Sequence, residues 1–144
     1  MAEDNLLRAS PAETGGQPAD EEHQPTVLVV EDNEPLRNAV TALLVREGYL
    51  VLAAATAHDA LEMFREPLSP IDVVLLDVRL PDLNGIDLCT RLRKSHPKLP
   101  IIVCTGVASP AEAAQLLALG AHRYFQKPIS AEELLSSVEA ALPP

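Results

Sequence analysis

Residues 71–77 read IDVVLLD: a short apolar run at 71–76, broken only by Asp72, and then Asp77. Two similar runs are VLVV at 27–30 and IIVC at 101–104. Apolar residues at nearly every position, rather than at alternate ones, indicate strands that are buried on both faces, as in a parallel sheet covered by helices. Two weaker strands are expected at 49–55 and 122–126, and their mixed character suits the edges of a sheet.

The segments between these strands carry helix signals. Asn33 and Thr56 are expected to cap the first two helices, and a third is expected from about residue 84 to 95. Ser109 and Ser130 each begin the pattern Ser-x-x-Glu, a capping box that opens the last two helices. The helical period predicts that the first helix buries one stripe, which consists of Leu36, Val40, Leu43 and Leu44.

Regular alternation of strands and helices predicts an α/β fold with right-handed crossovers. We expect a doubly wound, five-stranded parallel sheet with helices on both faces. The three fully apolar strands should be central and the two mixed strands should be edges, which selects the strand order 2-1-3-4-5.

Composition excludes several functional classes. The 144 residues are 47% hydrophobic, enough for a core, but only 3% aromatic, so that core must be aliphatic. We expect no signal peptide, because no basic segment followed by an apolar core stands near Met1, and no apolar run approaches the roughly 18 residues that span a bilayer. Cys89 and Cys104 form no CxxC pair, so we expect reduced thiols in a cytoplasmic protein without membrane contact. The net charge of −10 argues against direct nucleic-acid binding.

The first 25 residues differ from the rest. They hold six acidic side chains against one arginine, which is half of the net charge, together with three prolines. We expect residues 1–25 to be a flexible acidic tail and residues 26–144 to form one domain. Because the chain begins with Met1 and leaves no residues for a further domain after Pro144, we expect a single-domain protein.

The ends of the predicted strands carry the polar residues. Glu31 and Asp32 follow the first strand, Asp77 the third, Thr105 ends the fourth and Lys127 follows the fifth. Because ligands bind beyond the carboxyl ends of parallel strands, these side chains should meet at one edge of the sheet. Three carboxylates close together need compensation, for which Mg²⁺ and a lysine are suited. This combination favours phosphoryl transfer, with Asp77 as the candidate nucleophile.

These motifs resemble the receiver domain of two-component response regulators, a CheY-like, flavodoxin-like fold. The resemblance rests on VVEDN at 29–33, LLDVRLP at 75–81 with Gly85, Thr105-Gly106 and Lys127-Pro128. Intervals of 45, 28 and 22 residues separate Asp32, Asp77, Thr105 and Lys127, and they are similar to the family's spacing.

The resemblance implies a role for each matching residue. Asp77 would accept a phosphoryl group from a sensor histidine kinase or a histidine phosphotransfer protein, while catalysing no reaction on other substrates. Thr105 and Lys127 would contact that group. Mg²⁺ would be bound by Glu31 through water, by Asp32 and Asp77, and by the backbone carbonyl of Arg79.

The resemblance also implies how such a domain would signal. Tyr124 would turn inward as Thr105 moves, and the Lys127–Pro128 peptide bond would be cis. A downstream protein would dock on the helix after Ser109, the strand at 122–126 and the helix after Ser130.

Other functions remain open at this point. The chain is alternatively the receiver portion of a hybrid histidine kinase, acting as a relay or phosphate sink. A phosphatase of the haloacid dehalogenase type would need a second aspartate where Arg79 stands. An FMN-binding flavodoxin-like protein would need a Ser-, Thr- and Gly-rich loop where Glu31 and Asp32 stand.

Overall fold

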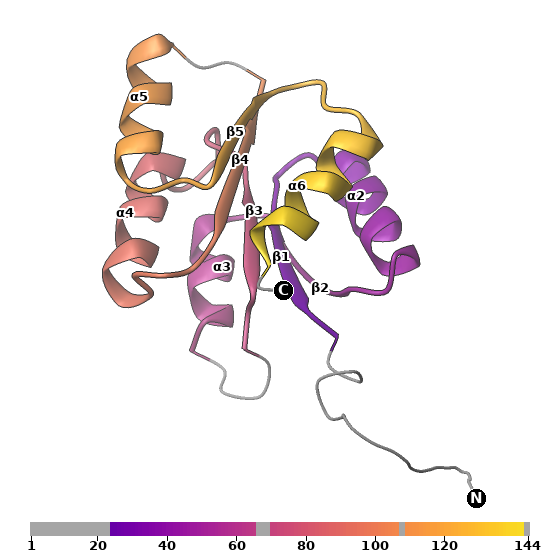
Figure 1. The fold of residues 1–144 in the computed structure, drawn as a ribbon. Coiled ribbons are helices and arrows are strands. Elements are labelled where there is room, and N and C mark those ends of the chain that lie inside the picture. Colours follow the sequence, from indigo (N-terminus) through magenta and orange to yellow (C-terminus); the bar gives the residue numbers. More distant parts are fainter. Residues whose placement is uncertain (1–23, 66–69, 107–108, 143–144) are drawn as a thin grey trace, which may run out of the picture.

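The computed structural model describes residues 24–65, 70–106 and 109–142, so nearly all of the predicted acidic tail lies outside it. Five strands and five helices alternate in this part of the chain (Figure 1). No helix in these ranges has the length and apolar character needed to cross a membrane. The strands are β1 (Thr26–Val30), β2 (Leu50–Ala54), β3 (Val73–Leu76), β4 (Ile101–Thr105) and β5 (Arg123–Gln126). The helices are α2 (Glu34–Arg46), α3 (Ala57–Met63), α4 (Gly85–Ser95), α5 (Pro110–Ala118) and α6 (Ala131–Ala141).

The strands form one parallel sheet in the order β2-β1-β3-β4-β5, which confirms the predicted topology. Strands β1 and β3 are buried at every position, and β4 is buried except at Cys104. The outer strands β2 and β5 are largely half-buried or exposed. The three apolar runs therefore form the central strands, which helices cover on both faces.

Helices cover both faces of the sheet (Figure 1). Alternate strand residues such as Leu28, Leu76 and Val103 pack with the interior of α3, α4 and α5. The intervening residues, such as Val29 and Leu75, pack under α2 and α6. The core is thus two aliphatic layers on either side of the strands, and neither layer depends on an aromatic side chain that is fully buried.

The predicted helix caps are confirmed. Asn33 Oδ1 accepts a hydrogen bond from the Leu36 amide at 2.9 Å, and Thr56 caps α3 in the same way. Both Ser-x-x-Glu patterns form reciprocal capping boxes, at α5 and at α6. These caps determine the residue at which each helix begins after the carboxyl end of a strand. They therefore also set the length of the loops that carry the polar residues.

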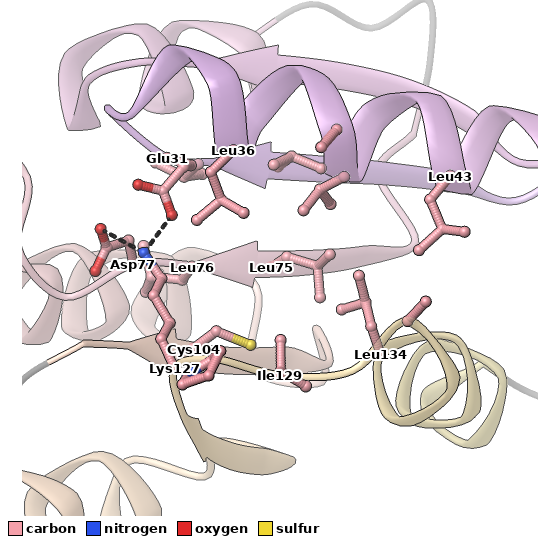
Figure 2. Close-up of a pocket in the computed structure, with 16 residues that line it drawn as sticks. Glu31, Leu36, Leu43, Leu75, Leu76, Asp77, Cys104, Lys127, Ile129 and Leu134 are labelled. Atoms are coloured by element: carbon pink, nitrogen blue, oxygen red, sulfur yellow. Dashed lines mark hydrogen bonds and ion pairs between the residues drawn. The ribbon is translucent and has the colours of Figure 1, made fainter.

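The predicted buried stripe of α2 is only partly correct. Leu44 is fully buried, but Leu36, Val40 and Leu43 are half-buried. They line a cavity of about 540 Å³ between α2 and α6, which opens at one end onto Glu31, Asp77 and Lys127 (Figure 2). The periodicity predicted the correct face of the helix, but this face borders the cavity between α2 and α6 and is therefore only partly covered.

Candidate functional site

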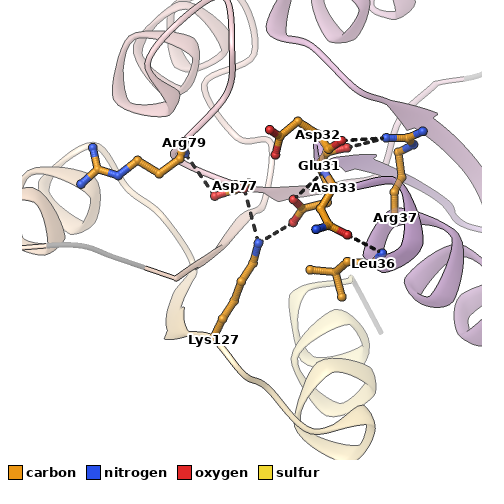
Figure 3. Close-up of polar contacts among 8 residues, drawn as sticks. All are labelled: Glu31, Asp32, Asn33, Leu36, Arg37, Asp77, Arg79 and Lys127. Carbon is orange, nitrogen blue, oxygen red and sulfur yellow. Dashed lines mark hydrogen bonds and ion pairs between the residues drawn. The ribbon is translucent and has the colours of Figure 1, made fainter.

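The polar residues predicted at the strand ends converge at one edge of the sheet. Glu31 and Asp32 follow β1, Asp77 follows β3, and Lys127 follows β5. Figure 3 shows their side chains directed toward a common point beyond the carboxyl ends of the strands. This point lies where the strand order reverses, since β1 pairs with β2 on one side and with β3 on the other.

Three carboxylates form the acidic part of the site. Glu31, Asp32 and Asp77 each offer an oxygen, and these oxygens lie within 4.8 Å of one another. Glu31 and Asp77 are each only 6% exposed, whereas Asp32 is exposed. The cluster is an all-oxygen donor set with one solvent-facing member, which suits a hard divalent cation that keeps some of its water.

Lys127 connects two of these acids. Its Nζ lies 2.6 Å from Glu31 Oε1 and 3.4 Å from Asp77 Oδ2 (Figures 2 and 3). Glu31 Oε2 also accepts a hydrogen bond from the Asn33 amide at 3.2 Å. One cation therefore compensates two of three carboxylates, and the site keeps an excess of negative charge.

The pKa values of Glu31 and Lys127 are both shifted upward, each by a different balance of burial and neighbouring groups. Burial raises the pKa of Glu31, and the charge of Asp77 raises it further; hydrogen bonds from Lys127 and from the Asn33 amide oppose this only in part. Burial lowers the pKa of Lys127, but the hydrogen bond to Glu31 and the charges of Asp77 and Glu31 outweigh it, so the pKa lies above its ordinary value. Lys127 therefore stays charged at neutral pH.

The loop after β3 holds the Asp77 carboxylate in place. The Arg79 amide donates to Asp77 Oδ1 at 3.1 Å. Gly85 closes this loop against the strand, and its amide donates to the Val78 carbonyl at 2.8 Å. A Cβ at position 85 would lie 2.5 Å from Val78 Cα and 2.9 Å from the Asp77 carbonyl oxygen. Only glycine allows this close approach of backbone to backbone.

Thr105 and Tyr124 lie on the same face of the sheet. Thr105 follows Val103 by two positions in β4, and Tyr124 pairs with Val103 from β5. Thr105 is fully buried and Tyr124 is half-buried against the core layer under α3, α4 and α5. The peptide bond between Lys127 and the following proline is cis. This arrangement places both residues that the resemblance linked to switching beside the same core layer.

Sequence reasoning missed three residues of the site's surroundings. Arg37 donates to the backbone carbonyls of Glu31 at 3.0 Å and Asp32 at 3.4 Å. Asp82 accepts from the Ala57 and His58 amides, both at 2.9 Å, and so joins the loop after Asp77 to the start of α3. Glu112 forms an ion pair with Arg79. Arg37 was detectable from its place one turn after the Asn33 cap, whereas the other two contacts span 24 or more residues.

Residues 27–139 match the family model of the response regulator receiver domain. This match covers most of the chain, and the chain belongs to that family. Its members are phosphoacceptors of two-component signalling and are not conventional enzymes. Membership therefore decides against the haloacid dehalogenase and flavodoxin alternatives.

Individual relatives agree with this assignment. A probable transcriptional regulatory protein of Picosynechococcus sp. strain PCC 7002 is 38% identical over 121 residues, which are 81% of this chain and 48% of the relative. The chain therefore spans about half the length of that relative. The crystal structure of a CheY-like receiver domain protein from Methanospirillum hungatei JF-1 has a TM-score of 0.77 at 30% identity, covering 82% of this chain and 93% of that one. The beryllofluoride-activated NtrC4 receiver domain dimer has a TM-score of 0.75 at 32% identity, covering 81% and 95%.

Proposed function

We propose that Asp77 is the phosphoacceptor of this receiver domain and that a phosphohistidine, on a sensor histidine kinase or a histidine phosphotransfer protein, is its donor. One observation carries the proposal: Asp77 is the aspartate of the acidic cluster that follows β3, the middle strand of the sheet, and that also contacts the Lys127 ammonium. An oxygen of Asp77 forms a bond to phosphorus, and the bond from phosphorus to the imidazole nitrogen breaks with its electron pair left on nitrogen. The imidazole leaves neutral when its second nitrogen carries a proton.

Two groups that contact the Asp77 carboxylate have different roles in this step. The Arg79 amide holds Asp77 Oδ1 and thereby fixes the orientation of the carboxylate. Lys127 lies 3.4 Å from the other oxygen, Oδ2, and its charge stabilises the negative charge that a phosphoryl group brings. Gly106 directly follows Thr105, and a Cβ there would meet no atom within 4 Å.

We assign Mg²⁺ to the acidic cluster. Glu31, Asp32, Asp77 and the Arg79 backbone carbonyl are the proposed ligands, with Glu31 acting through water. A bound Mg²⁺ would neutralise charge on the phosphoryl oxygens. The exposed Asp32 leaves room for water and phosphoryl oxygens around such an ion.

Phosphorylation is proposed to act on the surface formed by α5, β5 and α6. Thr105 and Tyr124 adjoin one core layer, and β5 leads directly into the loop before α6. Leu117 on α5 is 54% exposed, which gives this surface an apolar side chain for an unidentified downstream protein. The signal is a shift between two conformations of the domain, one of which the phosphoryl group stabilises.

The phosphoacceptor is tested with small-molecule donors. The protein is incubated with Mg²⁺ and acetyl phosphate or phosphoramidate, and its intact mass is measured. We expect one added phosphoryl group, and Asp77→Asn should abolish it. Asp87→Asn removes an exposed acid from the next helix and should leave it unchanged. Full labelling of the Asp77→Asn protein would refute the assignment.

The metal is tested by thermal unfolding. Mg²⁺ at millimolar concentration should raise Tm, because an ion that binds only the folded state stabilises it by mass action. Asp32→Asn should remove most of the increase while preserving the fold, since Asp32 is exposed. An equal increase in Tm with this variant would contradict the proposed ligand set.

A further inference from the structure

Arg79 contacts both Asp77, the proposed phosphoacceptor, and α5, a helix of the proposed docking surface. Its backbone amide donates to Asp77 Oδ1 at 3.1 Å, and its Nη2 donates to Glu112 Oε1, also at 3.1 Å. Figure 3 shows the Arg79 side chain extending away from the Asp77 carboxylate. A guanidinium two residues after the acceptor is thus directed to the first turn of α5 instead of to the site.

Glu112 has a second partner that fixes its position. The same oxygen, Oε1, accepts a hydrogen bond from the Ser109 amide at 3.1 Å, as part of the capping box of α5. Glu112 therefore cannot follow Arg79 without leaving the helix cap. The side chains of Arg79 and Glu112 are 49% and 21% exposed, so the ion pair is partly hydrated and its contribution is small.

A phosphoryl group on Asp77 would compete with Glu112 for this guanidinium. A phosphoryl group carries more negative charge than one carboxylate. It also presents several oxygens, and a planar guanidinium can donate two parallel hydrogen bonds to two of them. We infer that Glu112 positions Arg79 away from Asp77, that this ion pair opposes the phosphorylated state, and that phosphorylation draws Arg79 away from α5. The inference rests on Asp77 being the phosphoacceptor, as proposed above.

The coupling is reciprocal. If breaking the ion pair favours the phosphorylated state, then the phosphorylated state weakens the ion pair by the same factor. The first turn of α5 would then lose its connection to the loop after β3. Arg79 and Glu112 are positioning residues in this scheme, because they act on the equilibrium of the site and take no part in bond formation.

The test measures binding of beryllofluoride, which activates the similar NtrC4 receiver domain. Glu112→Gln removes the charge but keeps the capping box, because glutamine also serves at that position. At fixed Mg²⁺ we expect this variant to bind beryllofluoride about two- to fivefold more tightly, the range that one partly exposed ion pair supplies. In an Arg79→Ala background the same substitution should change affinity by less than about 1.5-fold.

A matched control comes from α6. Glu133 completes the same capping box with Ser130 and forms no ion pair with an arginine or lysine in the described part of the chain. Glu133→Gln should leave beryllofluoride affinity unchanged. An equal effect of Glu112→Gln with and without Arg79, or no effect at all, would overturn the inference.

A second readout separates positioning from general stability. Beryllofluoride should speed hydrogen exchange at the Ala113 amide, which donates to the Ser109 carbonyl in the first turn of α5. Glu112→Gln without beryllofluoride should show that faster exchange already. Unchanged exchange in both cases would contradict the inference, whereas absence of beryllofluoride binding to the native protein would refute the phosphoacceptor site itself.

Discussion

Lys127, which follows β5, donates a 2.6 Å hydrogen bond to Glu31, which follows β1, although β3 and β4 lie between these two strands in the sheet. The contact with Asp77 is longer, at 3.4 Å. The lysine is therefore held mainly by Glu31, and Asp77, the proposed phosphoacceptor, is the more distant of its two partners.

Removing the charge of Lys127 should lower the free energy of unfolding. Lys127→Met leaves Glu31 and Asp77 buried next to each other without a cation. We expect the free energy of unfolding to fall by about 1–3 kcal/mol, less than for a fully buried pair because the lysine side chain is 22% exposed. Urea unfolding in the presence of a chelator measures this. Lys98→Met, at an exposed position, should have little effect, and equal losses for both variants would argue against the role of the ion pair.

Gly85 should tolerate no side chain. Glycine to alanine at the start of a helix is ordinarily stabilising, but here the added Cβ would lie 2.5 Å from Val78 Cα. We expect Gly85→Ala to lower the free energy of unfolding by about 1–3 kcal/mol, since only backbone movement can relieve the contact. Gly106→Ala should stay within about 0.5 kcal/mol, because its Cβ meets no atom within 4 Å. Urea unfolding of both variants distinguishes them, and similar values would contradict the close approach.

Asp82 should make stability depend on acid pH. Hydrogen bonds from the Ala57 and His58 amides lower the pKa of Asp82 from its ordinary value of 3.8. A lowered pKa in the folded state means that the carboxylate stabilises the fold above pH 3.8 and that this contribution disappears as pH falls through the lowered value. Asp82→Asn should therefore reduce Tm at pH 7, and the difference from the native protein should shrink below pH 3.8. A difference that is constant with pH would exclude this origin.

Arg93 should be irreplaceable by lysine. Its guanidinium donates to five backbone carbonyls at 2.8–3.4 Å, which lie just after α4 and in the turn before β5. An ammonium group has fewer donors and lacks the planar fork. We expect Arg93→Lys to cost about 1–3 kcal/mol in urea unfolding. Arg91→Lys, an exposed position on the same helix, is the control, and a comparably stable Arg93→Lys protein would count against this prediction.

The sequence was sufficient for the topology because the decisive signals are local. Continuous apolar runs identified β1, β3 and β4 as central, and the helix caps followed from two- to four-residue patterns. The predicted ends of the strands were less accurate. The third strand was expected from Ile71 but begins at Val73. Asp72, the residue before it, accepts a 2.7 Å hydrogen bond from the Thr26 amide with its side chain.

The candidate site was predicted as a set of residues but not as a set of contacts. Parallel strands bring Glu31, Asp77 and Lys127 to one edge, so their meeting follows from topology alone. That Lys127 is closer to Glu31 than to Asp77 depends on side-chain conformations, which no pattern encodes. The pairing of Arg79 with Glu112 is hidden for the same reason, since 33 residues separate the two.

The cavity between α2 and α6 has a consequence for how this sequence can diverge. On that side of β3, small residues such as Ala39 and Ala131 line the cavity. Larger side chains at these positions would have room, so substitutions there should be tolerated. On the other side, Gly85 is pressed against the backbone and admits no change. Tolerance to larger side chains is therefore uneven around the acidic cluster: positions that line the cavity can accept them, whereas position 85 cannot.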